Sequence, residues 1–284
     1  MGSERALEAA LEAALGGLAE ARPIAGGDIN RALCVRLRDG RRVFVKTHPS
    51  PPPAMYAREA EGLAWLGEAG ALRVPAVIAV SERFLALEWI EPGAPARDHD
   101  ERLGRGLAAL HRAGAPGFGL AHDNFIGSLP QDNRAEPSWA AFYARRRLEP
   151  QLRRAVDAGR ASAAMRRGMQ DLLSRIDALV GPTEPPARLH GDLWGGNAHV
   201  AEDGAPVLID PAVYGGHREI DLAMMRLFGG FSERVFDAYA EAWPLADGAR
   251  ERVPLYQLYP LLVHVNLFGG GYVGSAERAL RAIL

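Results

Sequence analysis

The sequence predicts an α+β fold of two lobes: an N-terminal lobe with an antiparallel sheet and one key helix, and a larger, mainly helical C-terminal lobe. Short strand-like runs joined by turn dipeptides dominate residues 1–91, whereas the pattern becomes helical from Asp98 onward. The stretch E-P-G-A-P at 91–95 has the proline and glycine content of a linker. We therefore expect an N-terminal lobe of residues 1–91 and a C-terminal lobe of residues 92–284.

The composition is that of an ordinary globular protein and argues against several classes of function. The 284 residues are 48% apolar and 24% charged, and the formal charge of −2 offers no basic footprint for nucleic acid. No apolar run reaches the length of a membrane span, and the N-terminus lacks the basic start and apolar core of a signal peptide. A single cysteine excludes an internal disulfide. We expect a cytoplasmic protein with no nucleic-acid or membrane partner.

One hairpin signal and one helix organise the N-terminal lobe. An Asp-Gly pair at 39–40 separates two strand-like runs, the second of which, R-V-F-V-K-T, alternates apolar and polar residues. A proline-rich loop and a segment rich in Ala, Glu and Leu follow. The expected elements are a helix at 3–20 with leucines on one face, strands at 31–38 and 41–47, a helix at 54–69, and strands at 74–81 and 83–89.

Helical periodicity dominates the rest of the chain. The run Arg145-Arg146-Arg147 is expected on a solvated or salt-bridged helix face. The segment D-N-F-I-G at 123–127 is expected to be a loop, in which Asn124 either contacts substrate or forms part of a turn. Helices are expected at 100–113, 137–158, 162–180, 220–228, 232–243 and 255–265, with a last short helix after the G-G-G-Y turn.

The side chains suited to chemistry concentrate in the stretch 188–221. Asp192 lies in a glycine-rich loop, and Asn197 enters a strand-like run five residues later. An Asp-Gly pair at 203–204 is a hairpin turn signal between this run and a second one, which Asp210 follows. Since a tight hairpin brings its strand ends together, we expect Asn197 beside Asp210 and Asp192 in the loop that feeds the hairpin.

This set fits phosphoryl transfer from a nucleotide. Such a reaction needs oxygen ligands that hold Mg²⁺ against the phosphates and one carboxylate that accepts the proton of the attacking hydroxyl. Asn197 and Asp210 match the metal ligands, and Asp192 matches the catalytic base, at the Asp-to-Asn spacing that protein kinases use. The alternative is an ordinary turn followed by a strand-end cap. The ordered pattern with a hairpin between its parts favours the kinase-like site.

A lysine and a glutamate of the N-terminal lobe are candidates for holding the nucleotide. In kinases, a strand lysine contacts the α- and β-phosphates and is oriented by a glutamate of the next helix. Lys46 and Glu59 are placed for this pairing, with Glu61 as the alternative glutamate.

Backbone groups are expected to complete the nucleotide site. Gly26 and Gly27 would let backbone amides approach the phosphates, although a plain turn is an equal alternative. If the lobe boundary is placed correctly, the backbone of Glu88, Trp89 and Ile90 faces the adenine.

Four segments resemble the signature segments of the fructosamine kinase (ketosamine 3-kinase) family: H-G-D-L-W-G-G-N, I-D-P-A-V-Y-G-G-H-R-E-I-D-L-A-M, L-F-G-G-F and P-L-Y-Q-L-Y-P-L-L-V-H-V-N-L-F-G-G-G-Y. The resemblance runs from about Ala25 to the C-terminus. That family is similar to aminoglycoside phosphotransferases and, more remotely, to protein kinases, which implies a protein-kinase-like fold with ATP and Mg²⁺ as cofactors. The same resemblance selects Lys46 and Glu59.

The resemblance also implies the acceptor: the 3-hydroxyl of a ketosamine such as a fructosamine or ribulosamine, either a small molecule or a glycated amine of a protein. The reaction would serve deglycation or repair. An aminoglycoside, choline or homoserine kinase on the same scaffold is the alternative.

The acceptor is expected to be small or to protrude from its carrier, because only eight residues separate Asp210 from Glu219 and leave little room for a peptide platform. Trp194 either stacks on the sugar or packs under the loop. His217 and Arg218 either line the acceptor site or, for Arg218, form an ion pair with a carboxylate.

Two further residues are expected to support the catalytic loop. His190 is interpreted as a hydrogen-bonding anchor of the loop. Asp221 is interpreted as a brace for the loop, with a simple acid at a helix N-terminus as the alternative.

Overall fold

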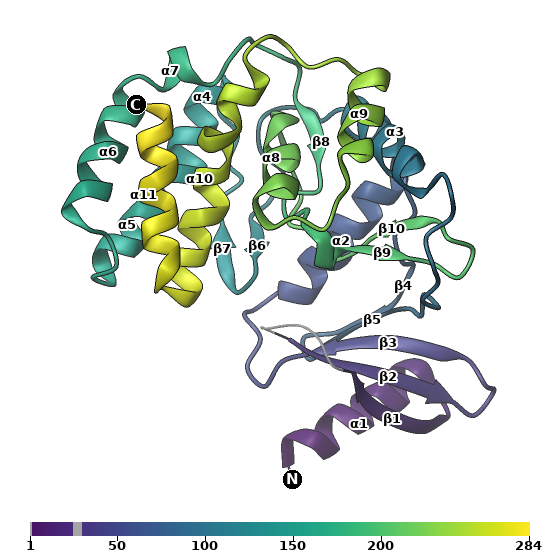
Figure 1. Ribbon diagram of the computed structural model, residues 1–284. Helices are drawn as coiled ribbons and strands as arrows, with labels where there is room; N and C mark the ends of the chain where they lie inside the picture. Colours follow the sequence, from purple (N-terminus) through teal and green to yellow (C-terminus); the bar gives the residue numbers. More distant parts are fainter. Residues whose placement is uncertain (1, 25–29) are drawn as a thin grey trace.

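The computed structural model describes residues 2–24 and 30–284 and has two lobes (Figure 1). The smaller lobe contains a five-stranded antiparallel sheet in the order β1-β2-β3-β5-β4. Helix α1 covers one face of this sheet, and α2 lies on the other face, toward the helical lobe. The elements are α1 (Gly2–Leu15), β1 (Leu18–Ile24), β2 (Arg31–Leu37), β3 (Arg42–Thr47), α2 (Met55–Glu68), β4 (Val77–Val80) and β5 (Phe84–Glu88).

Alternating side chains along the central strands create two buried faces. On one face, Val45 and Phe84 pack against Leu11 of α1. On the other face, Leu85 packs against Leu63 of α2. Successive residues of a strand point to opposite faces. A residue next to Val45 in β3 therefore points toward α2 and the second lobe.

The predicted helix at 3–20 is wrong in its last five residues. Helix α1 ends at Leu15, and Leu18 begins strand β1 instead of continuing the helical face. Gly16 and Gly17 have positive φ (66° and 63°), which ends a helix at little steric cost. The Glu12 carboxylate then accepts hydrogen bonds from the amides of Gly17 (3.1 Å) and Leu18 (2.7 Å).

The larger lobe is mainly helical. Its main core cluster includes Phe142, Met169, Leu189, Tyr214 and Leu262, all buried. The elements are α3 (His99–Arg112), β6 (Asn124–Ile126), β7 (Leu129–Gln131), α4 (Trp139–Phe142), the π-helical turn η1 (Tyr143–Leu148), α5 (Glu149–Asp157), α6 (Ala163–Ser174), α7 (Ile176–Leu179), β8 (Ala187–Leu189), the 3-10 turn η2 (Gly195–Asn197), β9 (Ala198–Val200), β10 (Pro206–Leu208), β11 (Tyr214–Gly216), α8 (Glu219–Phe228), α9 (Glu233–Ala242), α10 (Ala249–Phe268) and α11 (Gly271–Ile283).

Segment 123–127 was expected to be a loop, but most of it is strand. β6 pairs with β7 in a tight hairpin whose register joins Asn124 to Gln131 and Ile126 to Leu129. The buried side-chain amides of Asn124 and Gln131 anchor this hairpin to the chain after Asp210. These are tertiary contacts, which the local sequence does not predict.

Backbone hydrogen bonds and apolar packing contribute to the junction of the lobes. After β5, the amide of Gly93 donates to the carbonyl of Val200 in β9 (3.0 Å). Leu66 of α2 shares a buried cluster with Leu107 of α3 and Leu208 of β10. A boundary between residues 91 and 92 stays a prediction. No helix among the described residues is long and apolar enough to cross a membrane.

Candidate active site

Asp192, Asn197 and Asp210 come together around the β9–β10 hairpin. The hairpin pairs Ala198 with Leu208, and the amide of Ile209 donates to the carbonyl of Asn197 (3.0 Å). This register sets Asn197 beside Asp210, which follows Ile209. Asp192 lies in the loop between β8 and η2, and all three residues line one cavity.

Lys46 joins the two lobes through ion pairs. Its position in β3, next to Val45, turns its side chain toward α2. Lys46 Nζ lies 2.7 Å from Glu59 Oε1 and 3.0 Å from Asp210 Oδ1, and the residue is only 6% exposed. Burial by itself lowers the pKa of this lysine, but Asp210 and Glu59 outweigh burial, and the net pKa of Lys46 is raised. The ammonium group therefore stays charged at neutral pH.

The alternative glutamate of α2 has other partners. Glu61 Oε2 lies 2.7 Å from Arg58 Nη1 and 2.8 Å from His122 Nε2. Glu59 is therefore the residue that orients Lys46.

Asn197 holds Asp192 in place. Its Nδ2 donates to the Asp192 carbonyl oxygen (2.7 Å) and to Asp192 Oδ2 (3.3 Å). Burial and the charge of Asp210 raise the pKa of Asp192 to about 7, although the bond from Asn197 opposes this rise. A carboxyl group with a pKa near neutrality is well matched to accept a proton. Because the Asn197 nitrogen is used on Asp192, its amide oxygen is left as a ligand for a cation.

Asp221, at the start of α8, braces the loop that leads to Asp192. Its Oδ2 accepts a hydrogen bond from the amide of His190 (2.8 Å), and its Oδ1 accepts one from the amide of Gly191 (2.9 Å). Burial alone would raise the pKa of Asp221, but His111 and the loop amides hold it below its usual range. The ring of His190 also bonds to the Ile209 carbonyl (2.9 Å), which ties the loop to the end of β10.

His111 is a support that sequence reasoning missed. Its Nε2 lies 3.2 Å from Asp221 Oδ2, and its Nδ1 lies 2.8 Å from the Tyr239 hydroxyl. The available signal was a histidine on the apolar face of the amphipathic helix α3. Its partners are more than a hundred residues away in the chain, so the signal could not identify them.

The backbone around the site adopts rare conformations. Gly191 has a φ of 81°, and a Cβ there would lie 2.1 Å from the carbonyl oxygen of Ala212. Asp210 has a φ of 55°, although it is not glycine. Such conformations are costly and persist where surrounding contacts determine them. Here they direct the Asp210 carboxylate toward Lys46.

The cavity has a volume of about 690 Å³ and extends between the lobes. In the part of the chain that the structure describes, no group of three or more His, Cys, Asp or Glu side chains could hold a metal ion. Two oxygen donors, from Asn197 and Asp210, fit a Mg²⁺ whose remaining ligands are phosphates and water. The lining includes Lys46, Glu59, Asn124, Phe125, Gly127, Asp192, Trp194, Asn197, Asp210, Phe228, His264, Phe268 and Tyr272.

Comparison with known proteins decides the family. A family model described as fructosamine kinase matches residues 4–284. The chain belongs to the fructosamine kinase family. A Thermus thermophilus protein named "Probable ketoamine kinase" is 43% identical over 263 residues, which cover 92% of each chain. An Arabidopsis thaliana protein named "Protein-ribulosamine 3-kinase, chloroplastic" is 38% identical over 260 residues, which cover 89% of this chain and 79% of the relative.

A solved structure supports the same assignment. The crystal structure of a candidate fructosamine-3-kinase from Thermobifida fusca has a TM-score of 0.89 and 43% identity, and the match covers 97% of each chain. The expected protein-kinase-like fold is confirmed, and this member of the fructosamine kinase family is an ATP-dependent phosphotransferase.

Trp194 borders the cavity of this kinase. The indole is 42% exposed, so the loop covers it only in part. It lies over Gly196, where a Cβ would come within 2.3 Å of the ring.

His217 and Arg218 do not line the cavity, so the expectation that they bind the acceptor is wrong. Both are almost fully buried. Arg218 Nε donates to Glu184 Oε2 (2.7 Å), and the ring of His217 stacks on Tyr256 at 5.5 Å. The alternative ion pair of Arg218 is the correct interpretation.

Asn124 lines the cavity, but three of the four hydrogen-bonding positions of its amide are used within the protein. Its Nδ2 donates to the Val213 carbonyl (2.9 Å), and its Oδ1 accepts from Gln131 and Asn133 (2.8 Å each). A supporting role in the fold therefore explains Asn124 better than substrate contact.

The groups expected around adenine and phosphate are only partly visible. The amide of Glu88 donates to the Ala76 carbonyl (2.8 Å), so it is not available to the base. Neither Glu88 nor Trp89 and Ile90 line the cavity, and their role stays a prediction. Gly26 and Gly27 lie outside the described residues.

An aromatic wall of the cavity was also missed. His264 of α10 lies between Phe228 (centroids 4.5 Å apart) and Tyr272 (4.9 Å). Phe268 extends the wall 5.4 Å from His264 and is half exposed. These residues belong to two of the family-like segments, but only the packing of α8, α10 and α11 brings them together in the cavity that Trp194 also lines.

Proposed function

We propose that this kinase transfers the γ-phosphoryl group of ATP to the 3-hydroxyl of a ketosamine, a fructosamine or ribulosamine adduct of an amine. The observation that carries the proposal is the convergence of Lys46, Glu59 and Asp210 beside Asp192 and Asn197 in one cavity. The names of the relatives supply the acceptor class, since they include a ketoamine kinase and a protein-ribulosamine 3-kinase.

Each residue has a chemical task in this reaction. Lys46, oriented by Glu59, neutralises the α- and β-phosphates. Asn197 and Asp210 would hold Mg²⁺, which when bound screens the charge of the phosphates. Asp192 orients the sugar hydroxyl and accepts its proton while the oxygen forms a bond to the γ-phosphorus and the bond to the bridging oxygen of ADP breaks.

The environment of Asp192 supports its role as the base. Burial keeps its pKa near 7, so the carboxylate has greater proton affinity than an exposed aspartate. Trp194 lies two residues away and lines the cavity at 42% exposed, and such an indole can stack on the apolar face of a sugar ring. Trp194 would thus provide a stacking surface for the sugar, and Asp192 would provide the base for one of its hydroxyl groups.

The decisive experiment incubates the protein with ATP, Mg²⁺ and defined acceptors: fructosyl-lysine, ribulosyl-lysine, choline and an aminoglycoside. We expect turnover of the ketosamines with the phosphate on the third sugar oxygen, located by NMR. Asp192→Ala should abolish turnover, whereas Asp171→Ala, at an exposed aspartate of α6, should not. Turnover of choline or the aminoglycoside alone would refute the acceptor and leave the kinase assignment intact.

A further inference from the structure

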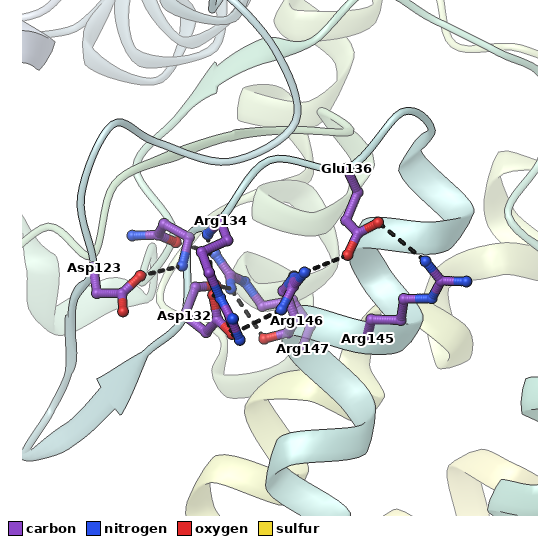
Figure 2. A network of polar contacts seen from close by, with 8 residues as sticks. Asp123, Asp132, Arg134, Glu136, Arg145, Arg146 and Arg147 are labelled. Atoms are coloured by element: carbon purple, nitrogen blue, oxygen red, sulfur yellow. Dashed lines mark hydrogen bonds and ion pairs between the residues drawn. The ribbon is translucent and has the colours of Figure 1, made fainter.

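Arg147 is the largest fully buried side chain among the described residues, at 0% exposed. Its neighbours Arg145 and Arg146 form ion pairs with carboxylates, with Arg145 at 3.2 Å and Arg146 at 2.6 Å from Glu136 (Figure 2). Arg147 has no carboxylate partner within 4.0 Å in the described part of the chain. A buried cation is costly unless hydrogen bonds and neighbouring groups compensate it.

Carbonyl groups and aromatic rings provide that compensation. Arg147 Nη1 donates to the Asp132 carbonyl (2.7 Å), and Nη2 donates to Asn133 Oδ1 (2.7 Å). The guanidinium carbon lies 3.9 Å from the ring centroid of Tyr214 and 4.5 Å from that of Phe142. Arginine is suited to such a site because its planar group stacks and donates in a fixed geometry.

The helix is distorted where it presents this side chain. Arg147 belongs to η1, a π-helical turn between the α-helical segments α4 and α5. π-helical turns are rare and occur often at functional sites. The run of three arginines thus splits into two that face carboxylates near the surface and one that enters the core (Figure 2).

Two routes lead from Arg147 to the active site. Along the first route, Asn133 Nδ2 donates to Asn124 Oδ1 (2.8 Å), and Asn124 Nδ2 donates to the Val213 carbonyl (2.9 Å), three residues after Asp210. Gln131 reinforces this route with a bond to the Ala212 carbonyl (3.1 Å).

The second route runs through Tyr214, on which the Arg147 guanidinium stacks. Its Cε1 lies 3.2 Å from the point where a Cβ of Gly191 would stand. Between the two routes, the Ala212 amide donates to the His190 carbonyl (2.9 Å). The segment after Asp210 and the loop before Asp192 are therefore linked to Arg147 through Asn133 and Tyr214.

We propose that Arg147 is a positioning residue of the kinase. Through Asn133 and Asn124 it holds the β6–β7 hairpin and segment 211–213 in place. That hairpin contributes Phe125 and Gly127 to the cavity, and the segment fixes the direction of Asp210. The inference rests on the proposed function only for the choice of acceptor.

The test compares Arg147→Met with Arg145→Met, the same change at an exposed arginine two residues away. Steady-state kinetics use ATP and fructosyl-lysine, and hydrogen exchange is followed in peptides covering 123–133 and 209–216. We expect Arg147→Met to raise the acceptor KM and lower kcat/KM by about 10- to 100-fold, because small misplacements of reacting groups have effects of this size. The KM for ATP should change less than the acceptor KM, because Lys46 keeps its ion pair with Glu59, which lies outside the network. Exchange should accelerate in both peptides, and Arg145→Met should match the wild type.

Asn133→Asp provides a second variant if Arg147→Met does not fold. A carboxylate at position 133 can still accept the hydrogen bond from Arg147 and would form an ion pair with it. It has no N–H group to donate to Asn124 Oδ1. We expect a folded protein with a raised acceptor KM and faster exchange at 209–216.

Several results would overturn the proposal. One is wild-type kinetics and exchange in either folded variant. Another is a loss of kcat that follows only the unfolded fraction, at unchanged KM. If the wild-type protein phosphorylates no ketosamine, the proposed function fails, but hydrogen exchange at 123–133 and 209–216 still tests whether Arg147 holds these segments in place.

Discussion

The Asp221 carboxylate accepts a hydrogen bond from the amide of Gly191 at 2.9 Å, and it is 1% exposed. The first turn of α8 therefore fixes a loop that lies 30 residues earlier in the chain. Because Gly191 precedes Asp192, the position of the proposed base depends on a carboxylate that never contacts the substrate. This dependence can be tested separately from the chemistry.

Asp221→Asn should destabilise the protein by about 3–5 kcal/mol, the usual effect of breaking a buried charged network. An asparagine has only one acceptor oxygen for two loop amides, and its NH₂ group would face donors. Urea unfolding measures the change, with Asp171→Asn on the surface as the matched control. An unfolding free energy equal to that of the wild type would contradict the bracing role.

Gly191→Ala should reduce both stability and kcat. A Cβ would lie 2.1 Å from the Ala212 carbonyl oxygen at a φ of 81°, so the loop must move. Gly40→Ala is the matched control, because Gly40 has a φ of 90° with no atom within 4 Å of a Cβ. The control should lose only about 1 kcal/mol, from backbone conformation alone, and should keep its kcat. Equal effects of the two substitutions on stability and kcat would show that the contact with Ala212 is unimportant.

Asp192→Asn should make the metal-free protein more stable at pH 8. Burial raises the folded-state pKa of Asp192 from 3.8 to about 7, so the wild type gains stability from the protonated carboxyl group below the unfolded pKa. That contribution is lost as the pH rises through 7, because the charged form is disfavoured in the folded protein. The neutral asparagine avoids this loss, which is about 4 kcal/mol at most.

The measurement is urea unfolding in EDTA at pH 4 and pH 8. At pH 8 the free energy of unfolding of the variant should exceed that of the wild type. The difference between the two free energies should shrink toward pH 4. A pH-independent difference would mean that the pKa of Asp192 is not raised.

Trp194→Ala should raise the KM for a ketosamine by roughly tenfold, as expected from the loss of a stacking contact of about 1.4 kcal/mol. Trp194→Phe retains an aromatic face and should recover most of the affinity. The KM for ATP should stay close to the wild-type value in both variants. Equal acceptor KM values in the two variants and the wild type would exclude stacking.

Local patterns were enough to find the central residues of the candidate site. The Asp-Gly turn at 203–204 and the short runs around it imply that Asn197 and Asp210 are neighbours, and the hairpin has that register. The alternation of β3 likewise turns Lys46 toward the helix that carries Glu59. In each case the regular geometry of a strand or hairpin determines where the side chains lie, so a short sequence pattern is enough to predict their positions.

Tertiary contacts decided the positions that the sequence did not predict. Arg218 is part of a family-like segment, but Glu184, 34 residues earlier in the chain, draws it into the core. The sequence does not distinguish Arg147 from Arg145 and Arg146. In the structure all three lie in the π-helical turn, where Arg147 is buried and the other two face carboxylates. Leu18 fits a helical face, but the two preceding glycines end the helix before it.

Lys46, the buried partner of Glu59, is also the one lysine among the 33 Lys and Arg residues of the chain. Sugars condense with unprotonated primary amines, and arginine side chains stay protonated and offer no such amine. Among its side chains, the kinase therefore exposes no lysine amine to the reaction whose products it is proposed to process.

Prolonged incubation with ribose, followed by peptide mass spectrometry, should find no ketosamine on any side chain of the wild type. Arg145→Lys, which places an amine at an exposed position, should acquire one. An adduct on Lys46 would show that its ion pairs do not shield it. Arginine at the other 32 of these positions would thus keep the side chains of the enzyme free of the adducts that it is proposed to phosphorylate.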